Sequence, residues 1–139
     1  MPPSIEHHIA YITARATRSL ERELEEALRP EKIPLSTARV LGLLDDTQGR
    51  PMSDLADAVL VDPPTMTKMI DRMVSQSLVF RAPDPDDRRR VLIFMAPRGQ
   101  ELWQRVQPIL AAQQARLEAA LSPERLDRLT DALNALMQA

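Results

Sequence analysis

The chain has 139 residues, a formal net charge of -2, 44% hydrophobic residues and no cysteine. This length suits one domain that folds without a metal or a disulfide, and the lack of cysteine excludes disulfides, thiolate metal sites and a thiol nucleophile. The slight acidity argues against a protein that coats nucleic acid, and because no apolar run approaches the roughly 20 residues of a membrane span, we expect a cytoplasmic protein with no membrane partner.

Apolar residues three or four positions apart predict a first amphipathic helix over residues 4–28, since this spacing places them on one helical face. They are Ile5, Ile9, Ile12, Ala16, Leu20, Leu24 and Leu28. The adjacent His7 and His8 point to different sides of a helix and lack a partner four residues away, so we interpret them as a solvated helix start rather than as metal ligands. Two prolines within 29–34 end this helix.

Two short helices joined by a turn are predicted next, as in the first part of a helix-turn-helix. Ser36 is the expected N-cap of a helix that runs to about Thr47, and residues 45–51 form the turn. Ser53 is the expected N-cap of a helix over 54–60, where its hydroxyl is also a candidate phosphate ligand. The residues expected to face inward are Ala38, Leu41 and Leu44, then Leu55, Ala56 and Val59.

Asp62 and Pro63 predict the start of a fourth helix, as its N-cap and first residue. The helical period places Met66, Ile70, Met73 and Ser77 inward, with Met69 at the edge, and Pro64, Thr65, Thr67, Lys68, Arg72 and Ser75 outward or flanking. Hydroxyl, methyl and cationic groups together suit base edges and phosphates in a DNA groove, although an ordinary solvated helix face has the same pattern. Asp71 has the wrong charge for phosphate, so we expect it to pair with a neighbouring arginine.

Residues 78–82 and 91–95 are rich in β-branched and aromatic residues and predict a hairpin with a long loop over 83–90. This loop carries three aspartates and three consecutive arginines: Asp84, Asp86, Asp87, Arg88, Arg89 and Arg90. The aspartates cannot neutralise every arginine, and an arginine left free can enter a narrow minor groove. Such a charged run is also compatible with a solvated surface patch. The segment 62–90 is the positive part of the chain, with six basic and five acidic residues.

Pro97 restarts a helix that is expected to reach Ser122 with a bend at Pro108, and Ser122 with Pro123 begins a last helix. Apolar residues mark one side of both helices, from Leu102 to Leu121 and from Leu126 to Met137. Together with the first helix they have more apolar surface than a small DNA-reading head can cover. A symmetric homodimer that buries the surplus is therefore predicted.

This order of helices and hairpin resembles the MarR family of winged helix-turn-helix transcriptional regulators over nearly the whole chain. The segments that carry the resemblance are LADAVLVDPPTMTKMIDRMVSQSLVFR, residues 55–81, and DPDDRRRVLIFMAPRG, residues 84–99. The second is similar to the D-x-R wing signature of that family. The resemblance implies a mainly α-helical fold with a small β-hairpin wing.

By the same resemblance, residues 1–139 form a single domain. Its winged helix-turn-helix would span 34–96, and its dimerisation helices would span 4–29 and 97–139. A homodimer would bind a pseudo-palindromic operator in double-stranded DNA, as a ligand-responsive repressor.

The resemblance also assigns roles to individual residues. Asp87 would brace the wing, Arg89 would enter the minor groove, and Thr65, Thr67 and Lys68 would face the major groove. A small aromatic or anionic effector would bind between the dimer helices and the DNA-reading heads. Candidate residues for this pocket are Tyr11, Arg15, Arg39 and Trp103, and for each of them ordinary packing or surface exposure remains the alternative.

Three residues depart from the family pattern. Leu60 and Ser77 stand where glycines usually turn the chain, and Ala96 replaces a threonine cap.

A winged-helix module that binds protein without binding DNA remains the alternative function. An enzyme fits least, because the sequence has no Gly-rich phosphate loop, no metal-ligand spacing and no nucleophile beside a base, so neither a cofactor nor a metal is predicted.

Overall fold

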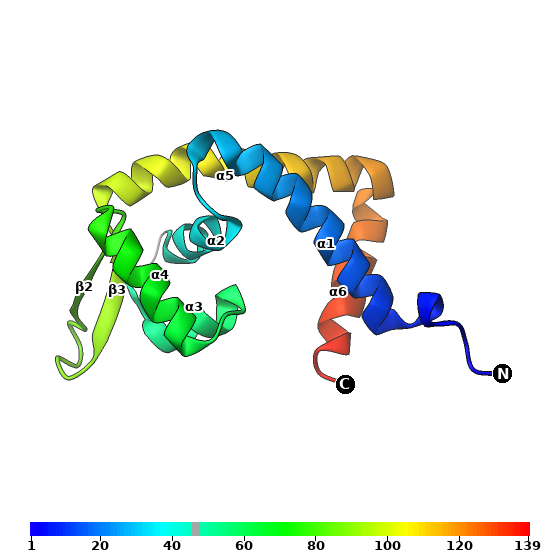
Figure 1. Ribbon diagram of the computed structural model, residues 1–139, viewed down its shortest axis with the longest axis horizontal. Helices are drawn as coiled ribbons and strands as arrows, with labels where there is room; N and C mark the ends of the chain where they lie inside the picture. Colours follow the sequence, from blue (N-terminus) through cyan, green and yellow to red (C-terminus); the bar gives the residue numbers. More distant parts are fainter. Residues whose placement is uncertain (46–47) are drawn as a thin grey trace.

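The computed structural model describes residues 1–45 and 48–139, and Figure 1 shows a head joined to a set of long helices. The head contains α2 (Leu35–Leu44), α3 (Met52–Val59), α4 (Pro63–Ser75) and a small sheet. From the head, α5 (Pro97–Leu121) crosses the top of the view, and α1 (Ile9–Leu28) and α6 (Pro123–Leu136) descend on the right. Short 3-10 turns, η1 (Ile5–His7) and η2 (Arg29–Glu31), flank α1. The predicted mainly α-helical fold with a β-hairpin wing is confirmed.

The sheet has three antiparallel strands in the order β1, β3, β2. β2 (Val79–Pro83) pairs with β3 (Val91–Met95) along its whole length and forms the predicted hairpin. The first strand begins and ends one residue later than predicted, and the second has the predicted bounds. β1 (Arg50–Pro51) was not predicted, since the sequence places it in a turn. It pairs with β3, and the Arg50 Nε donates a hydrogen bond to the Leu43 carbonyl at 2.7 Å. This short strand thereby ties the end of α2 to the wing.

The core lies in the head and continues along the first half of α5. It contains residues of α2, α3, α4, the wing strands and the start of α5, and it includes all the residues predicted to face inward in α2 and α3. In α4, Met66, Ile70 and Met73 are buried as predicted. Ser77 is not, because the helix ends at Ser75 and Ser77 lies in an exposed turn with φ 61°. That prediction was wrong.

Two predicted caps were also wrong. α2 begins at Leu35 and α3 at Met52, one residue before the serines expected to cap them, so Ser36 and Ser53 lie inside the helices. The preceding Pro34 and Pro51 are the N-cap residues and have extended backbones. Because proline has a fixed φ and its carbonyl can still accept hydrogen bonds, each helix can start directly after it without a side-chain cap. The Pro34 carbonyl accepts from Thr37 at 3.1 Å and from Ala38 at 3.3 Å.

The other helix ends follow the sequence more closely. Ser122 caps α6 by accepting the Arg125 N–H at 3.3 Å, as predicted. α5 continues through Pro108 to Leu121. The α-helical part of the first helix begins at Ile9 rather than at residue 4, and α2 ends at Leu44. The last predicted residues of that helix, 46 and 47, lie outside the described residues.

Candidate nucleic-acid interface

α4 has one buried side and one exposed side, and this fixes which residues can meet a ligand. Met66, Ile70 and Met73 are at most 1% exposed and anchor the helix in the head. The opposite side is exposed and contains the predicted DNA-facing residues Pro64, Thr65, Thr67, Lys68 and Arg72. The Thr67 Oγ1 donates to the Pro63 carbonyl at 3.1 Å, which leaves its methyl group and oxygen lone pairs at the surface.

Asp62 caps α4 as predicted and holds the first turn in place. Its Oδ1 accepts the Thr65 backbone N–H at 2.7 Å, and Pro63 follows at the first helical position. This hydrogen bond from the Thr65 backbone, together with one from the Thr65 side chain, lowers the pKa of the Asp62 carboxyl below its usual value, while a slight desolvation opposes the change. The exposed start of α4 is therefore held by an ionised carboxylate.

A cross-element ion pair connects α4 to the wing. The Arg81 Nη2 on β2 donates to the Asp71 Oδ1 on α4. The sequence predicts that Asp71 pairs with a nearby arginine but does not identify Arg81, because the pair forms only when β2 folds back beside α4. This pair neutralises the acidic residue on the exposed side, so that Lys68 and Arg72 determine the charge of that surface.

The wing loop, residues 84–90, is closed by its own hydrogen bonds. The Asp84 N–H donates to the Arg90 carbonyl at 2.8 Å, and the Asp84 carboxylate accepts the Asp86 N–H at 2.9 Å. The Asp87 Oδ1 accepts from the Arg89 backbone at 3.2 Å and from its Nε at 3.3 Å. The sequence analysis did not predict that Asp84 holds the loop. An aspartate in a proline-rich turn is nevertheless typical of an Asx-turn, in which its carboxylate accepts the N–H two residues later.

The wing arginines are available for contact. The Arg89 side chain is 93% exposed even though it contacts Asp87, and Arg88 and Arg90 are exposed and take part in no ion pair among the described residues. In Figure 1 the wing tip and the N-terminal end of α4 both lie at the lower edge of the head. The start of the helix that carries the exposed threonines and cations therefore lies at the same edge of the head as the arginine-tipped loop. These are the two elements by which a winged helix contacts adjacent grooves of a duplex.

Comparisons with known proteins agree with this geometry. The MarR family model matches residues 33–91. The HTH-type transcriptional regulator YhbI of Bacillus subtilis is 30% identical over 110 residues, which cover 78% of this chain and 69% of YhbI. The chain belongs to the MarR family. The family predicted from the wing and α4 motifs is therefore confirmed.

Other similar proteins add detail. The homoprotocatechuate degradative operon repressor of Escherichia coli is 27% identical over 95 residues, which cover 68% of this chain and 64% of that repressor. The repressor CouR bound to a 23-mer DNA duplex superposes with a TM-score of 0.83 at 22% identity, covering 96% of this chain and 94% of CouR. CouR of Rhodococcus jostii RHA1 bound to p-coumaroyl-CoA superposes with a TM-score of 0.87 at 21% identity, covering 97% and 95%. At these identities CouR shows that the fold is shared.

The three departures from the MarR pattern lie at the ends of elements. Leu60 and Ser77 have positive φ angles of 67° and 61°, the left-handed region that glycine enters without steric conflict. Ala96 precedes α5 without a side-chain cap, and its N–H donates to the Leu78 carbonyl at 3.0 Å. Leu60 and Ser77 therefore adopt the left-handed backbone that is usual for glycine at a turn.

The four candidate pocket residues are not brought together within one chain. Tyr11 and Arg15 line a surface hollow on α1, with the Arg15 guanidinium carbon 5.8 Å from the Tyr11 ring centroid. Arg39 lines a different hollow and pairs with Glu21 at 3.6 Å. Trp103 packs against the core over Gly42, where a Cβ would meet its ring at 2.8 Å. Their common role in an effector site stays a prediction.

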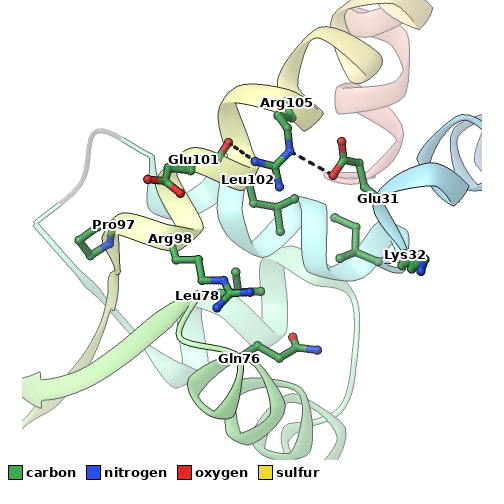
Figure 2. A pocket seen from close by; sticks show the side chains of 10 residues that line it. Glu31, Lys32, Gln76, Leu78, Pro97, Arg98, Glu101, Leu102 and Arg105 are labelled. Atoms are coloured by element: carbon green, nitrogen blue, oxygen red, sulfur yellow. Dashed lines mark hydrogen bonds and ion pairs between the residues drawn. The ribbon is translucent and has the colours of Figure 1, made fainter.

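A hollow of about 820 Å³ lies elsewhere, between η2, the end of α4 and the start of α5 (Figure 2). Arg105 crosses it, with its Nε 3.2 Å from Glu31 and its Nη1 3.5 Å from the Glu101 carbonyl. Arg98 also lines it and extends toward Gln76. None of the four candidate pocket residues lines this hollow.

The described residues contain no group of three or more His, Cys, Asp or Glu side chains that could hold a metal ion. Within residues 1–45 and 48–139, no helix has both the length and the apolar character needed to cross a bilayer.

Proposed function

We propose that the protein is a sequence-specific DNA-binding transcriptional regulator. The observation that carries this proposal is the two-sided character of α4, which is fixed by buried Met66, Ile70 and Met73 while its threonines and cations stay exposed. Lys68 and Arg72 would contact phosphates or guanine edges in the major groove, and the methyl groups of Thr65 and Thr67 would contact thymine methyls. Pro64 would add apolar contact at the helix start.

The wing and α3 would position this helix on the duplex. Arg89 would enter the minor groove, with Asp87 holding its side chain near the loop, and Arg88 and Arg90 would contact the flanking phosphates. Ser53 is exposed in the first turn of α3, where a hydroxyl and free backbone N–H groups suit a phosphate. These contacts would fix the position of α4 but carry little sequence information.

We propose further that the protein acts as a homodimer. Ile5, Ile9 and Ile12 at the N-terminal end and Leu129, Leu133, Leu136 and Met137 on or beside α6 are between 39% and 77% exposed. A second copy that covers these residues would place two α4 helices about 34 Å apart, one helical turn of DNA, on a pseudo-palindromic operator. The regulator would then be a repressor if its operator overlaps a promoter.

A small aromatic or anionic effector would regulate this binding. CouR has been solved both with a DNA duplex and with p-coumaroyl-CoA, and its fold is shared by this chain. We propose that an effector binds near Tyr11, Arg15, Arg39 and Trp103 once the dimer has formed. It would weaken operator binding by favouring a spacing of the heads that does not match the duplex.

Recovery of bound duplexes from a pool of genomic fragments, followed by titration with the recovered duplex, tests the DNA-binding proposal. Lys68→Ala and Arg89→Ala should each weaken binding by about 1–3 kcal/mol, and loss of a phosphate contact should lower the salt slope by about one. The substitution Lys32→Ala, at an exposed lysine outside α4, the wing and the proposed dimer helices, is the matched control and should leave both quantities unchanged. Equal affinity of the Lys68 variant and wild type would reject the site. A wild-type protein that binds no duplex at low salt would instead favour a protein-binding module.

A further inference from the structure

One side of α1 carries a cluster of cations that the proposed DNA contacts do not use. Tyr11, Arg15, Arg18, Ser19 and Arg22 line a surface hollow of about 630 Å³, and we call these five residues the arginine face. Steps of three and four residues align the arginines along the helix. The helical period places them on the side away from Leu20, Leu24 and Leu28, the residues by which α1 packs inward.

The arginines of this face have no acidic partner in the described part of the chain. Arg15, Arg18 and Arg22 occur in none of its ion pairs. The glutamates of α1 that do form ion pairs bind arginines of other segments: Glu21 with Arg39, Glu23 with Arg116, and Glu26 with Arg29. These three glutamates are therefore directed toward α2, α5 and η2. Glu25, three residues after Arg22, occurs in no ion pair among the described residues and lines another hollow together with Arg39, so the acids of α1 offset the three arginines only in part.

This arrangement is unfavourable for the free helix. Like charges at positions i and i+3 or i+4 destabilise a helix, and Arg15 with Arg18, and Arg18 with Arg22, are two such pairs. The Tyr11 ring lies beside the Arg15 guanidinium, at 5.8 Å, and favours one orientation of that side chain. A bound anion would reduce this repulsion, so the arginine face should favour binding of a negatively charged ligand.

The spacing of the arginines indicates what kind of anion fits. Seven residues of helix rise by about 10 Å from Arg15 to Arg22. A phosphate or carboxylate group can accept from neighbouring guanidinium groups, but one group is much shorter than the roughly 10 Å between the outer two arginines along the helix, so it compensates only part of the face. An anion with several such groups, spread along this length, can engage all three arginines.

We propose that the arginine face of α1 binds a small molecule that carries at least two phosphate or carboxylate groups. Binding itself does not depend on the proposed DNA contacts. Its regulatory meaning, as part of the effector site, rests on the proposed function.

Thermal unfolding of the full chain tests the site with two defined probes, tripolyphosphate and citrate, each compared with sodium chloride of equal ionic strength. A specific anion site should raise the Tm by about 3 °C or more at saturating concentration of at least one probe. A rise with tripolyphosphate alone identifies a phosphate ligand, and a rise with citrate alone identifies a carboxylate ligand. No rise with either probe overturns the proposal.

The triple variant Arg15→Gln, Arg18→Gln and Arg22→Gln should abolish the rise. Without a probe its Tm should equal or exceed that of the wild type, because the like-charge pairs are gone. The variant Arg125→Gln and Arg128→Gln on α6 is the matched control and should keep the full rise. If the triple variant keeps the rise, or the α6 control loses it, the site is elsewhere or the effect is general charge screening.

Two further measurements separate this proposal from other uses of the face. If the triple variant binds the recovered duplex more weakly and with a lower salt slope, the arginines contact DNA phosphates and the small-anion site is overturned. If the variant dissociates into monomers, the face binds a second copy, which also overturns it. A wild-type protein that shows the anion-dependent rise but binds no duplex would refute the proposed function and leave the anion site standing.

Discussion

The head and the long helices use their apolar residues in opposite ways. In the head, α2, α3 and α4 each bury at least three residues, and the wing strands bury three more. α1 buries Leu28 alone, and α6, which is described in full, buries none. Both regions have apolar residues at helical spacing, so the pattern alone does not tell whether a face is covered within the chain. The difference indicates that the head is stabilised by its own core, whereas apolar residues at the ends of the chain remain exposed in a single copy.

The largest expected effect is in the head. Ile70→Ala removes a side chain of α4 that is 0% exposed, and the loss of buried surface and the cavity should lower the free energy of unfolding by about 2–5 kcal/mol. Urea denaturation measures this change.

In contrast, Leu133→Asp on α6 should leave the helical circular dichroism of the head in place but raise the dimer dissociation constant at least about tenfold.

Analytical ultracentrifugation over a dilution series measures that dissociation, with Asp127→Asn on α6 as the control. A Leu133→Asp protein that dimerises as the wild type does would contradict the proposed role of α6. A Leu133→Asp protein that loses the fold of the head would contradict the independence of the two regions.

The sequence predicted features that depend on local chemistry. Helical periodicity found the buried side of α4, and aspartate or serine followed by proline found the starts of α4 and α6, because a cap and a first residue act within three positions. It failed where a partner from a distant part of the chain decides the outcome. β1 exists because Arg50 and Pro51 meet β3 some forty residues later. The caps of α2 and α3 are a local exception, because prolines two residues before the expected serines are the N-cap residues.

The candidate site follows the same division. Exposure of Thr65 and Lys68 follows from the helical period, so the exposed side of α4 could be predicted from residues alone. The pairing of Asp71 with Arg81 requires β2 to fold beside α4, which no local pattern gives. Tyr11, Arg39 and Trp103 belong to three different helices whose separation only the fold determines.

A medium effect is expected at the turn between α3 and α4. Leu60 is 81% exposed and has φ 67°, so its side chain gains little from packing while its backbone lies in a region that disfavours a Cβ. Leu60→Gly should therefore raise the free energy of unfolding by about 1 kcal/mol. Urea denaturation again provides the measurement. The substitution Leu129→Gly is the comparison, at a residue inside α6 that is 45% exposed. It should lower the free energy of unfolding by about 1 kcal/mol, because glycine disfavours a helix interior. Destabilisation by both substitutions would show that Leu60 is not strained.

The smallest expected effect distinguishes the caps of the two regions. Asp62 caps α4 with a carboxylate, whereas Ser122 caps α6 with a hydroxyl that does not titrate in this range. Because hydrogen bonds from Thr65 lower the pKa of Asp62 in the folded state, its contribution to stability is complete above the unfolded pKa of about 3.9 and is lost as the pH falls through the lower folded value.

Asn caps a helix about as well as Asp but has no charge to lose, so Asp62→Asn should unfold like the wild type at pH 7 and lose less stability below about pH 4. Urea midpoints between pH 7 and pH 2.5 measure this, with Asp131→Asn on α6 as the control substitution. If Asp62→Asn and the wild type lose stability in parallel as the pH falls, the carboxylate does not act as a titrating cap. If the Asp131→Asn control flattens the curve as much as Asp62→Asn does, the acid sensitivity comes from overall charge rather than from the start of α4.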